Sequence, residues 1–66
     1  MAISKTTERI WRDFYAKEAP YWVDKPWALI GTMEAIMAAE EDTPRYRLKK
    51  MRLALEAYNQ ALRERK

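Results

Sequence analysis

The side chains of this chain that could take part in chemistry are carboxylates, tyrosines, lysines and hydroxyl groups. There is no cysteine and no histidine, so the commonest general base and the commonest metal ligand are missing. Gly31 is the only glycine, which rules out a glycine-rich phosphate loop. Glu40, Glu41 and Asp42 could attract a hard cation, but they are consecutive and lack the alternating spacing of a calcium loop. We therefore predict that the protein is not an enzyme and holds no cofactor or metal.

Cations gather in residues 45–52, whose sequence is RYRLKKMR. Such a cluster near the start of a helix can bind the phosphates of a nucleic acid. The acidic residues just before it, and the spread of the cations over two sides of the helix, argue against this interpretation. Nucleic acid is therefore an alternative partner and not the first prediction. The predicted basic patch consists of Arg45, Arg47, Lys49, Lys50 and Arg52.

Charge is distributed unevenly along the chain. Residues 1–42 carry eight acidic and five basic residues, a net charge of −3, whereas residues 43–66 carry eight basic and two acidic residues, a net charge of +6. Such asymmetry can mark a segment that binds polyanions. It also allows two parts of one small domain to attract each other, which is the interpretation we favour.

Two prolines and three aromatic residues lie within the ten residues EAPYWVDKPW, residues 18–27. Because a proline disfavours helical geometry in the residue before it, we expect the first helix to end at Ala19 and a Pro/Trp-rich connection to follow. Large aromatic side chains either fill a core or anchor a partner. We expect Trp27 to be buried and Trp22 to be available to a partner.

Capping residues and apolar periodicity predict three helices, near residues 6–19, 25–41 and 44–64, and no β-strand. The first of these is expected to bury Trp11 and Phe14. In the second, Gly31 implies either the close approach of another group or a kink. Three helices with short connections predict a single all-α domain over residues 1–66, a small three-helix bundle.

The last predicted helix has apolar residues at the alternating spacings of three and four that are typical of a coiled coil. We expect this stripe to face the core, with a homodimer seam as the alternative. Leu53 and Tyr46 lie on the opposite side of the helix and would form a second contact surface, either for a partner protein or for another copy of the chain. The stripe consists of Leu48, Met51, Leu55, Tyr58 and Leu62.

These features favour binding over catalysis. We predict a small, non-catalytic protein-binding module that inhibits or connects partners by occluding a protein surface. The alternatives are a nucleic-acid-binding protein and a homo-oligomeric structural protein. The longest apolar stretch, near residues 27–30, is too short to span a bilayer, so we expect a cytoplasmic protein without a membrane partner. The predicted partner-binding residues are Tyr21, Trp22, Tyr46 and Leu53.

Overall fold

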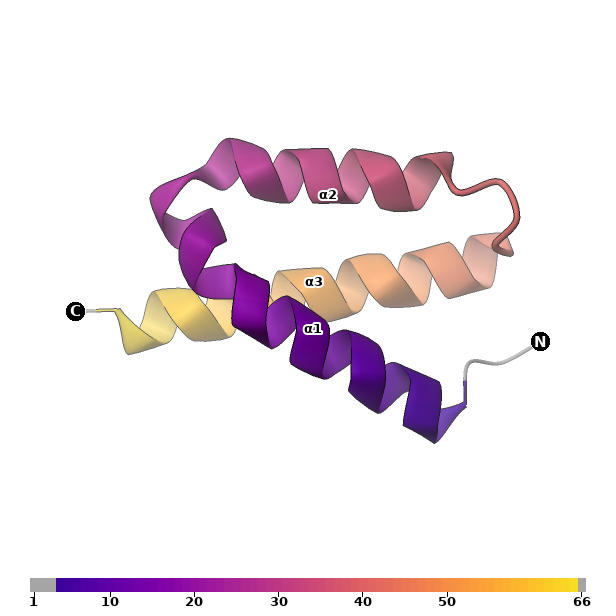
Figure 1. Ribbon diagram of the computed structural model, residues 1–66, viewed down its shortest axis with the longest axis horizontal. Coiled ribbons are helices and arrows are strands. Elements are labelled where there is room, and N and C mark those ends of the chain that lie inside the picture. The colour runs from indigo at the N-terminus through magenta and orange to yellow at the C-terminus, as the bar shows by residue number, and fades with distance from the viewer. Residues whose placement is uncertain (1–3, 66) are drawn as a thin grey trace.

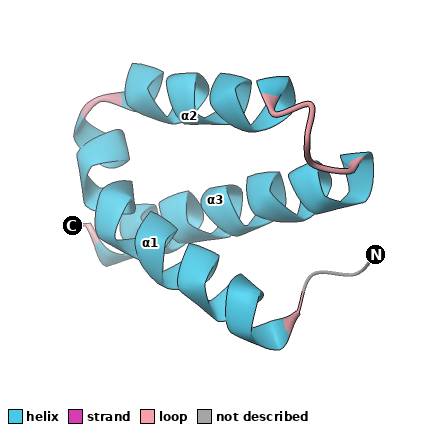
Figure 2. Ribbon diagram, turned by 45° about the vertical axis from the view of Figure 1, so that its right-hand side comes forward, coloured by secondary structure: helices cyan, strands magenta, loops and turns pink. Residues whose placement is uncertain are grey.

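Residues 4–65 are described by a computed structural model, in which three helices follow one another through short connections (Figure 1). Helix α1 spans Lys5–Asp24, α2 spans Pro26–Ala38 and α3 spans Pro44–Glu64. The described residues contain no β-strand, which confirms the all-α three-helix prediction (Figure 2). α1 packs mainly on α3, while α2 makes fewer contacts with either of them. No helix in residues 4–65 is long and apolar enough to cross a membrane.

The helix starts follow from local capping. The side-chain oxygen of Ser4 accepts a hydrogen bond from the backbone N–H of Thr7, and that of Thr43 accepts one from Tyr46, each at 3.1 Å. Pro26 begins α2 and Pro44 begins α3, where the missing N–H costs no helical hydrogen bond. The predicted starts of all three helices therefore hold to within one residue.

The prediction that α1 ends at Ala19 is wrong. The helix continues through Pro20 to Asp24, so the predicted Pro/Trp-rich connection is helical and only Lys25 separates α1 from α2. An internal proline costs about 3 kcal/mol because it removes one hydrogen bond and crowds the preceding turn. That cost is offset by burial, since Ala19 and Trp22 on the two sides of Pro20 are both buried.

The core lies between the three helices, with its largest side chains on α1. The ring of Tyr15 stacks on that of Trp11 with centroids 5.6 Å apart and lies 6.0 Å from the ring of Trp22. Helix α3 contributes smaller groups, which allow α1 to approach closely. The buried apolar residues are Tyr15, Ala19, Trp22, Leu29, Ile36, Leu53 and Ala54.

Gly31 produces neither of the two features expected of it. Helix α2 runs unbroken through this residue, and a Cβ atom added to it would meet nothing within 4 Å. The hydroxyl of Thr32 donates to the carbonyl of Ala28 within the same helix. α2 instead ends at Ala38, three residues earlier than predicted, and the acidic residues after it form the turn into α3.

Three ion pairs connect different elements of the fold. Lys49 pairs with Glu8 at 2.9 Å, Lys50 with Asp42 at 3.1 Å and Arg65 with Asp24 at 3.2 Å. Each joins a cation from the basic part of the chain to a carboxylate from the acidic part. The uneven charge distribution thus serves internal attraction, as we favoured from the sequence.

Candidate interaction surface

Two of the predicted partner-binding residues belong to the core. Trp22 is only 2% exposed and Leu53 only 1%, which contradicts the expectation that they face a partner. The continuation of α1 places Trp22 seven residues after Tyr15, on the same side of the helix. Leu53 is buried because α1 packs on that side of α3.

The other two predicted residues differ from each other. Tyr46 is half-buried, and its hydroxyl accepts a hydrogen bond from Nε1 of Trp11 at 3.2 Å, so it links α3 to α1. Tyr21 is exposed and remains available. Trp27 is 64% exposed, with the Lys25 ammonium 5.3 Å from its ring centroid. The expected burial of Trp22 and Trp27 is therefore reversed.

Helix α1 carries a row of exposed apolar side chains, which we call the α1 face: Ile10, Phe14 and Tyr21. Each is at least half exposed, which corrects the expectation that Phe14 is buried. At about 100° per residue the three point in the same direction, roughly 130° away from the buried side of the helix. The ring of Phe14 meets that of half-buried Trp11 edge-on, with centroids 5.8 Å apart.

The apolar stripe predicted to face the core from α3 does so only in part, because Met51 and Tyr58 pack against the core whereas its three leucines are exposed. Leu48, Leu55 and Leu62 are 60%, 45% and 42% exposed, whereas Met51 and Tyr58 are half-buried. At about 100° per residue the three leucines point roughly 160° away from Leu53. Because Leu53 lies against α1, the leucines lie on the side of α3 that is opposite α1.

Helix α2 extends this apolar surface. Its Thr32 and Ile36 line a groove together with three residues of α1 and Lys50 of α3. The exposed large apolar side chains that point away from this groove are those of Ile30 and Met37. The antiparallel course of α2 and α3 then brings these side chains and the α3 leucines to one side of the helix pair. We call this surface the α2–α3 face, formed by the exposed side chains of Ile30, Met37, Leu48, Leu55 and Leu62.

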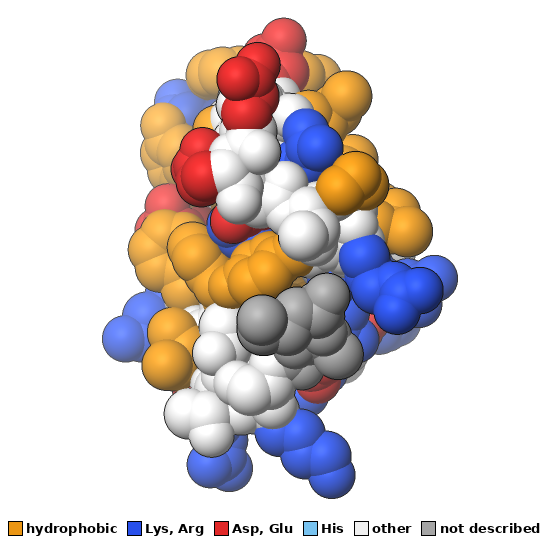
Figure 3. Space-filling view, turned by 90° about the vertical axis from the view of Figure 1, so that its right-hand side faces the viewer, with side chains coloured by type: hydrophobic (Ala, Val, Ile, Leu, Met, Phe, Trp, Pro, Cys, Tyr) orange, Lys and Arg blue, Asp and Glu red, His pale blue; other side chains and the backbone are white. Residues whose placement is uncertain are grey.

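Figure 3 views the molecule from the end that carries the turn between α2 and α3. Hydrophobic side chains show on both its left and its right side, and Lys and Arg side chains cluster at the right edge.

The predicted basic patch does not form one surface. Arg47 donates to the backbone carbonyl of Met37 at 2.8 Å, and Lys49 pairs with Glu8. The hydrogen bond from Lys49, with further attraction from Arg12, holds the pKa of Glu8 below its usual value. Within the described residues, Arg45 and Arg52 have no hydrogen-bond or ion-pair partner and are exposed.

Lys50 is the most deeply placed cation, only 9% exposed. Its ammonium pairs with Asp42 and lies 4.3 Å from the ring centroid of Trp11 and 5.2 Å from that of Tyr46. The charge is therefore satisfied by one carboxylate and two aromatic faces. Lys50 thus connects the turn before α3, through Asp42, with Trp11 of α1 and Tyr46 of α3. Its ammonium is therefore unavailable to the phosphates of a nucleic acid.

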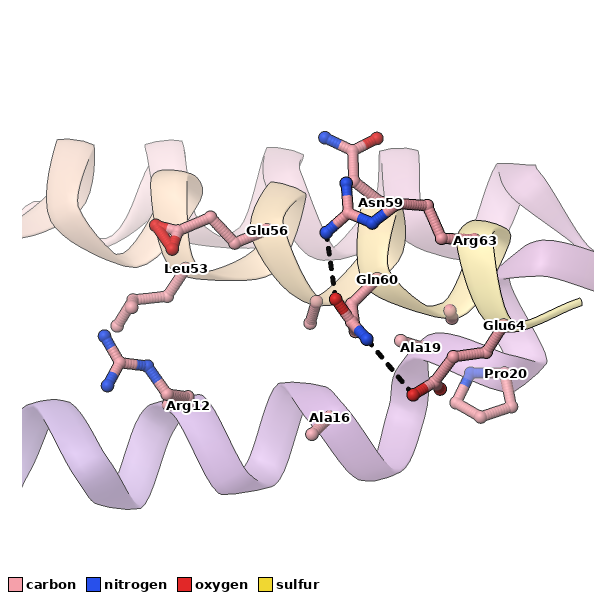
Figure 4. A pocket seen from close by; sticks show the side chains of 12 residues that line it. Arg12, Ala16, Ala19, Pro20, Leu53, Glu56, Asn59, Gln60, Arg63 and Glu64 are labelled. Carbon is pink, nitrogen blue, oxygen red and sulfur yellow. Dashed lines mark hydrogen bonds between the residues drawn. The ribbon is translucent and has the colours of Figure 1, made fainter.

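A cleft between α1 and α3 has a floor of small side chains, including Ala16 and Ala19, and polar walls (Figure 4). In its wall Arg63 donates to Gln60, which donates to Glu64. No lining residue has a buried polar side-chain atom without a partner, so these polar groups already satisfy one another. Residues 4–65 also contain no group of three or more acidic side chains placed to hold a metal ion.

Comparison with known protein families, with curated proteins and with solved structures finds no match to this chain. The surface itself is thus the basis for inferring function.

The sequence did not predict that Ile10, Phe14 and the leucines of α3 are exposed, although all of them belong to apolar patterns that were recognised in it. The patterns located the apolar sides of the helices but did not reveal which of them α1, α2 and α3 cover.

Proposed function

We propose that the protein is a small, non-catalytic protein-binding module that engages its partner through the α1 face. The observation that carries the proposal is the row formed by Ile10, Phe14 and Tyr21 on one side of a regular helix, each at least half exposed. Aromatic side chains are enriched at the energetic centres of protein interfaces. A helix that presents apolar residues at such intervals is suited to a groove on another protein.

The α1 face is also ordered before it meets a partner. The helix holds the backbone, and the edge-on contact with Trp11 restricts the ring of Phe14. Restriction of this kind lowers the entropy that is lost on binding. Trp27, which is exposed three residues beyond the end of α1, adds a further aromatic group at the same end of the molecule as Tyr21.

The charges around the α1 face favour a protein over a nucleic acid. Asp13 and Lys17 lie on this side of α1 and are exposed, so the border carries both signs of charge. A phosphate-binding surface would instead carry mainly cations. Arg45 and Arg52, the two basic-patch residues without an internal partner, lie on α3. A module of this kind acts by occluding the surface that it covers.

Photo-crosslinking in the cell that makes the protein tests this proposal. A benzophenone amino acid at Phe14 is expected to yield a discrete protein adduct, and the same amino acid at exposed Asn59 on α3 is the control. With the captured partner purified, Phe14→Ala should weaken binding by about 2 kcal/mol, or roughly thirtyfold. Equal adducts from both positions, or an adduct from Phe14 that nuclease removes, would contradict the proposal.

A further inference from the structure

Helix α2 is apolar on every side, although the rest of the chain covers only part of it. Glu34 is the only charged residue among its thirteen, and only Leu29 and Ile36 are buried. A helix that is apolar all round is typical of one that is packed on all sides. A substantial part of the apolar surface of α2 is thus not covered by any other part of the described chain.

Helix α3 continues the uncovered surface. Leu48, Leu55 and Leu62 recur at intervals of seven residues, the spacing of a seam between packed helices. Since α1 lies on the opposite side of α3, no helix of the described chain covers them. The α2–α3 face therefore presents two antiparallel helices side by side, which is the exposed half of a four-helix arrangement.

We infer that the α2–α3 face binds a second copy of the chain. The two copies are related by a two-fold axis parallel to the helices, so that α2 of each lies over α3 of the other. Every helix of the resulting four-helix bundle then has antiparallel neighbours, which is the usual up-and-down arrangement. Both copies of α1 remain on the outside.

Charge complementarity selects this occupant and this arrangement. The hydrogen bond from Arg47 to the carbonyl of Met37 places these two residues at a similar height along the antiparallel pair α2 and α3. Three residues before Met37, Glu34 then lies at about the height of Lys50, and Arg52 is about half a turn further along α3. Glu34 and Arg52 are both exposed and border opposite edges of the α2–α3 face. The two-fold axis therefore places Glu34 of each copy opposite Arg52 of the other.

Other occupants fit the charges less well. A two-fold axis perpendicular to the helices would lay α3 on α3 and bring Arg45 and Arg52 towards the same cations of the second copy, which is unfavourable. An acidic helix from a different protein would suit these arginines but would meet Glu34 on the other edge. A second copy satisfies both edges at once.

The size of the face indicates a weak dimer. Thirteen helical residues extend about 20 Å, and two helices side by side are about 20 Å wide, which gives a footprint of roughly 400 Å² per copy. Leu62 extends the face beyond the end of α2. The total is below the 1,200–2,000 Å² that is typical of stable specific complexes. The dimer is therefore expected to be weak and transient, as is typical of interfaces below this size.

Sedimentation of the wild type and two charge variants tests the inference. The wild type should shift from monomer to dimer between about 5 and about 500 µM. Glu34→Arg and Arg52→Glu should each weaken dimerisation about tenfold, because each replaces two opposite-charge pairs with like-charge pairs. An equimolar mixture of the two variants should recover the wild-type affinity, since both pairs become complementary again.

Variants of the two faces separate this inference from the proposed function. Leu55→Glu should abolish the dimer while circular dichroism at low concentration shows an unchanged helix content, and Phe14→Ala should dimerise like the wild type. The monomeric Leu55→Glu variant should still form the Phe14 photoadduct. A wild type that stays monomeric throughout, a mixture that does not associate, or a Leu55→Glu variant that dimerises normally would overturn the inference.

Discussion

Replacing Trp22 with alanine tests whether the tryptophan that follows Pro20 holds the fold together. The side chain is 2% exposed and packs 6.0 Å from the ring of Tyr15. A buried tryptophan removes about 200 Å² from water, which corresponds to about 5 kcal/mol at 25 cal/mol per Å². Truncation of such a residue to alanine typically costs about 3 to 5 kcal/mol.

The whole domain has little stability to lose. At about 0.05 to 0.15 kcal/mol per residue, a chain of 66 residues is stabilised by roughly 3 to 10 kcal/mol. Trp22→Ala should therefore be largely unfolded or marginally stable at room temperature. Trp27→Ala is the matched control, because that side chain is 64% exposed and contacts the Lys25 ammonium. Its loss should cost less than about 1 kcal/mol.

Urea unfolding followed by far-ultraviolet circular dichroism measures both variants. Trp22→Phe, which leaves a smaller ring in the same place, should lie between Trp22→Ala and the wild type and keep a cooperative transition. If Trp22→Ala unfolds at the same urea concentration as the wild type while Trp27→Ala is unfolded without urea, then the assignment of Trp22 to the core is refuted. Equal and large losses in both would instead show that Trp27 also supports the fold.

Two further predictions concern Tyr15 and Gly31. Burial, with a contribution from Tyr46 and Asp42, raises the pKa of Tyr15 to about 12. Because the unfolded chain releases this proton near pH 10 and the folded chain does not, the free energy of unfolding should fall as pH rises from about 10 to about 12, by up to roughly 2.7 kcal/mol. Urea titrations of wild type and Tyr15→Phe should show the extra loss only in the wild type, with Tyr21→Phe as the control; parallel pH profiles would argue against the shifted pKa. Gly31→Ala should raise the free energy of unfolding by about 0.5 to 1 kcal/mol, because the position is helical and open, and a lower melting temperature would reveal a contact that the fold does not show.

Where the helices begin is determined largely by local sequence. Thr43 and Pro44 act within one turn of the start of α3, and the predicted range of 44–64 is the range observed. Ser4 acts in the same way for α1, and Pro26 for α2. Such signals need no knowledge of the rest of the fold, because capping hydrogen bonds and the missing N–H of proline operate over three or four residues.

The length of α1 depended on more than local preference. Helices usually stop before a proline because a proline inside a helix costs about 3 kcal/mol. In α1 this cost is outweighed by the burial of Ala19 and Trp22, which lie before and after Pro20. That burial requires α2 and α3 to be in place. The roles of Trp22 and Trp27 were therefore beyond what the residues around them could indicate.

Which apolar side of α3 faces the core was likewise decided only by tertiary structure. The sequence showed that α3 has two such sides, a stripe that includes Leu48, Leu55 and Leu62 and an opposite side with Leu53 and Tyr46. The larger and more regular stripe is predicted to face the core, but α1 packs on the side of Leu53, where Ala54, Ala57 and Ala61 are at least half-buried. Small side chains let two helix backbones approach closely, and close packing of α1 with its aromatic residues fills the core without the three leucines. The periodicity of one helix fixes its apolar sides, and only the shapes of the neighbouring helices determine which side they cover.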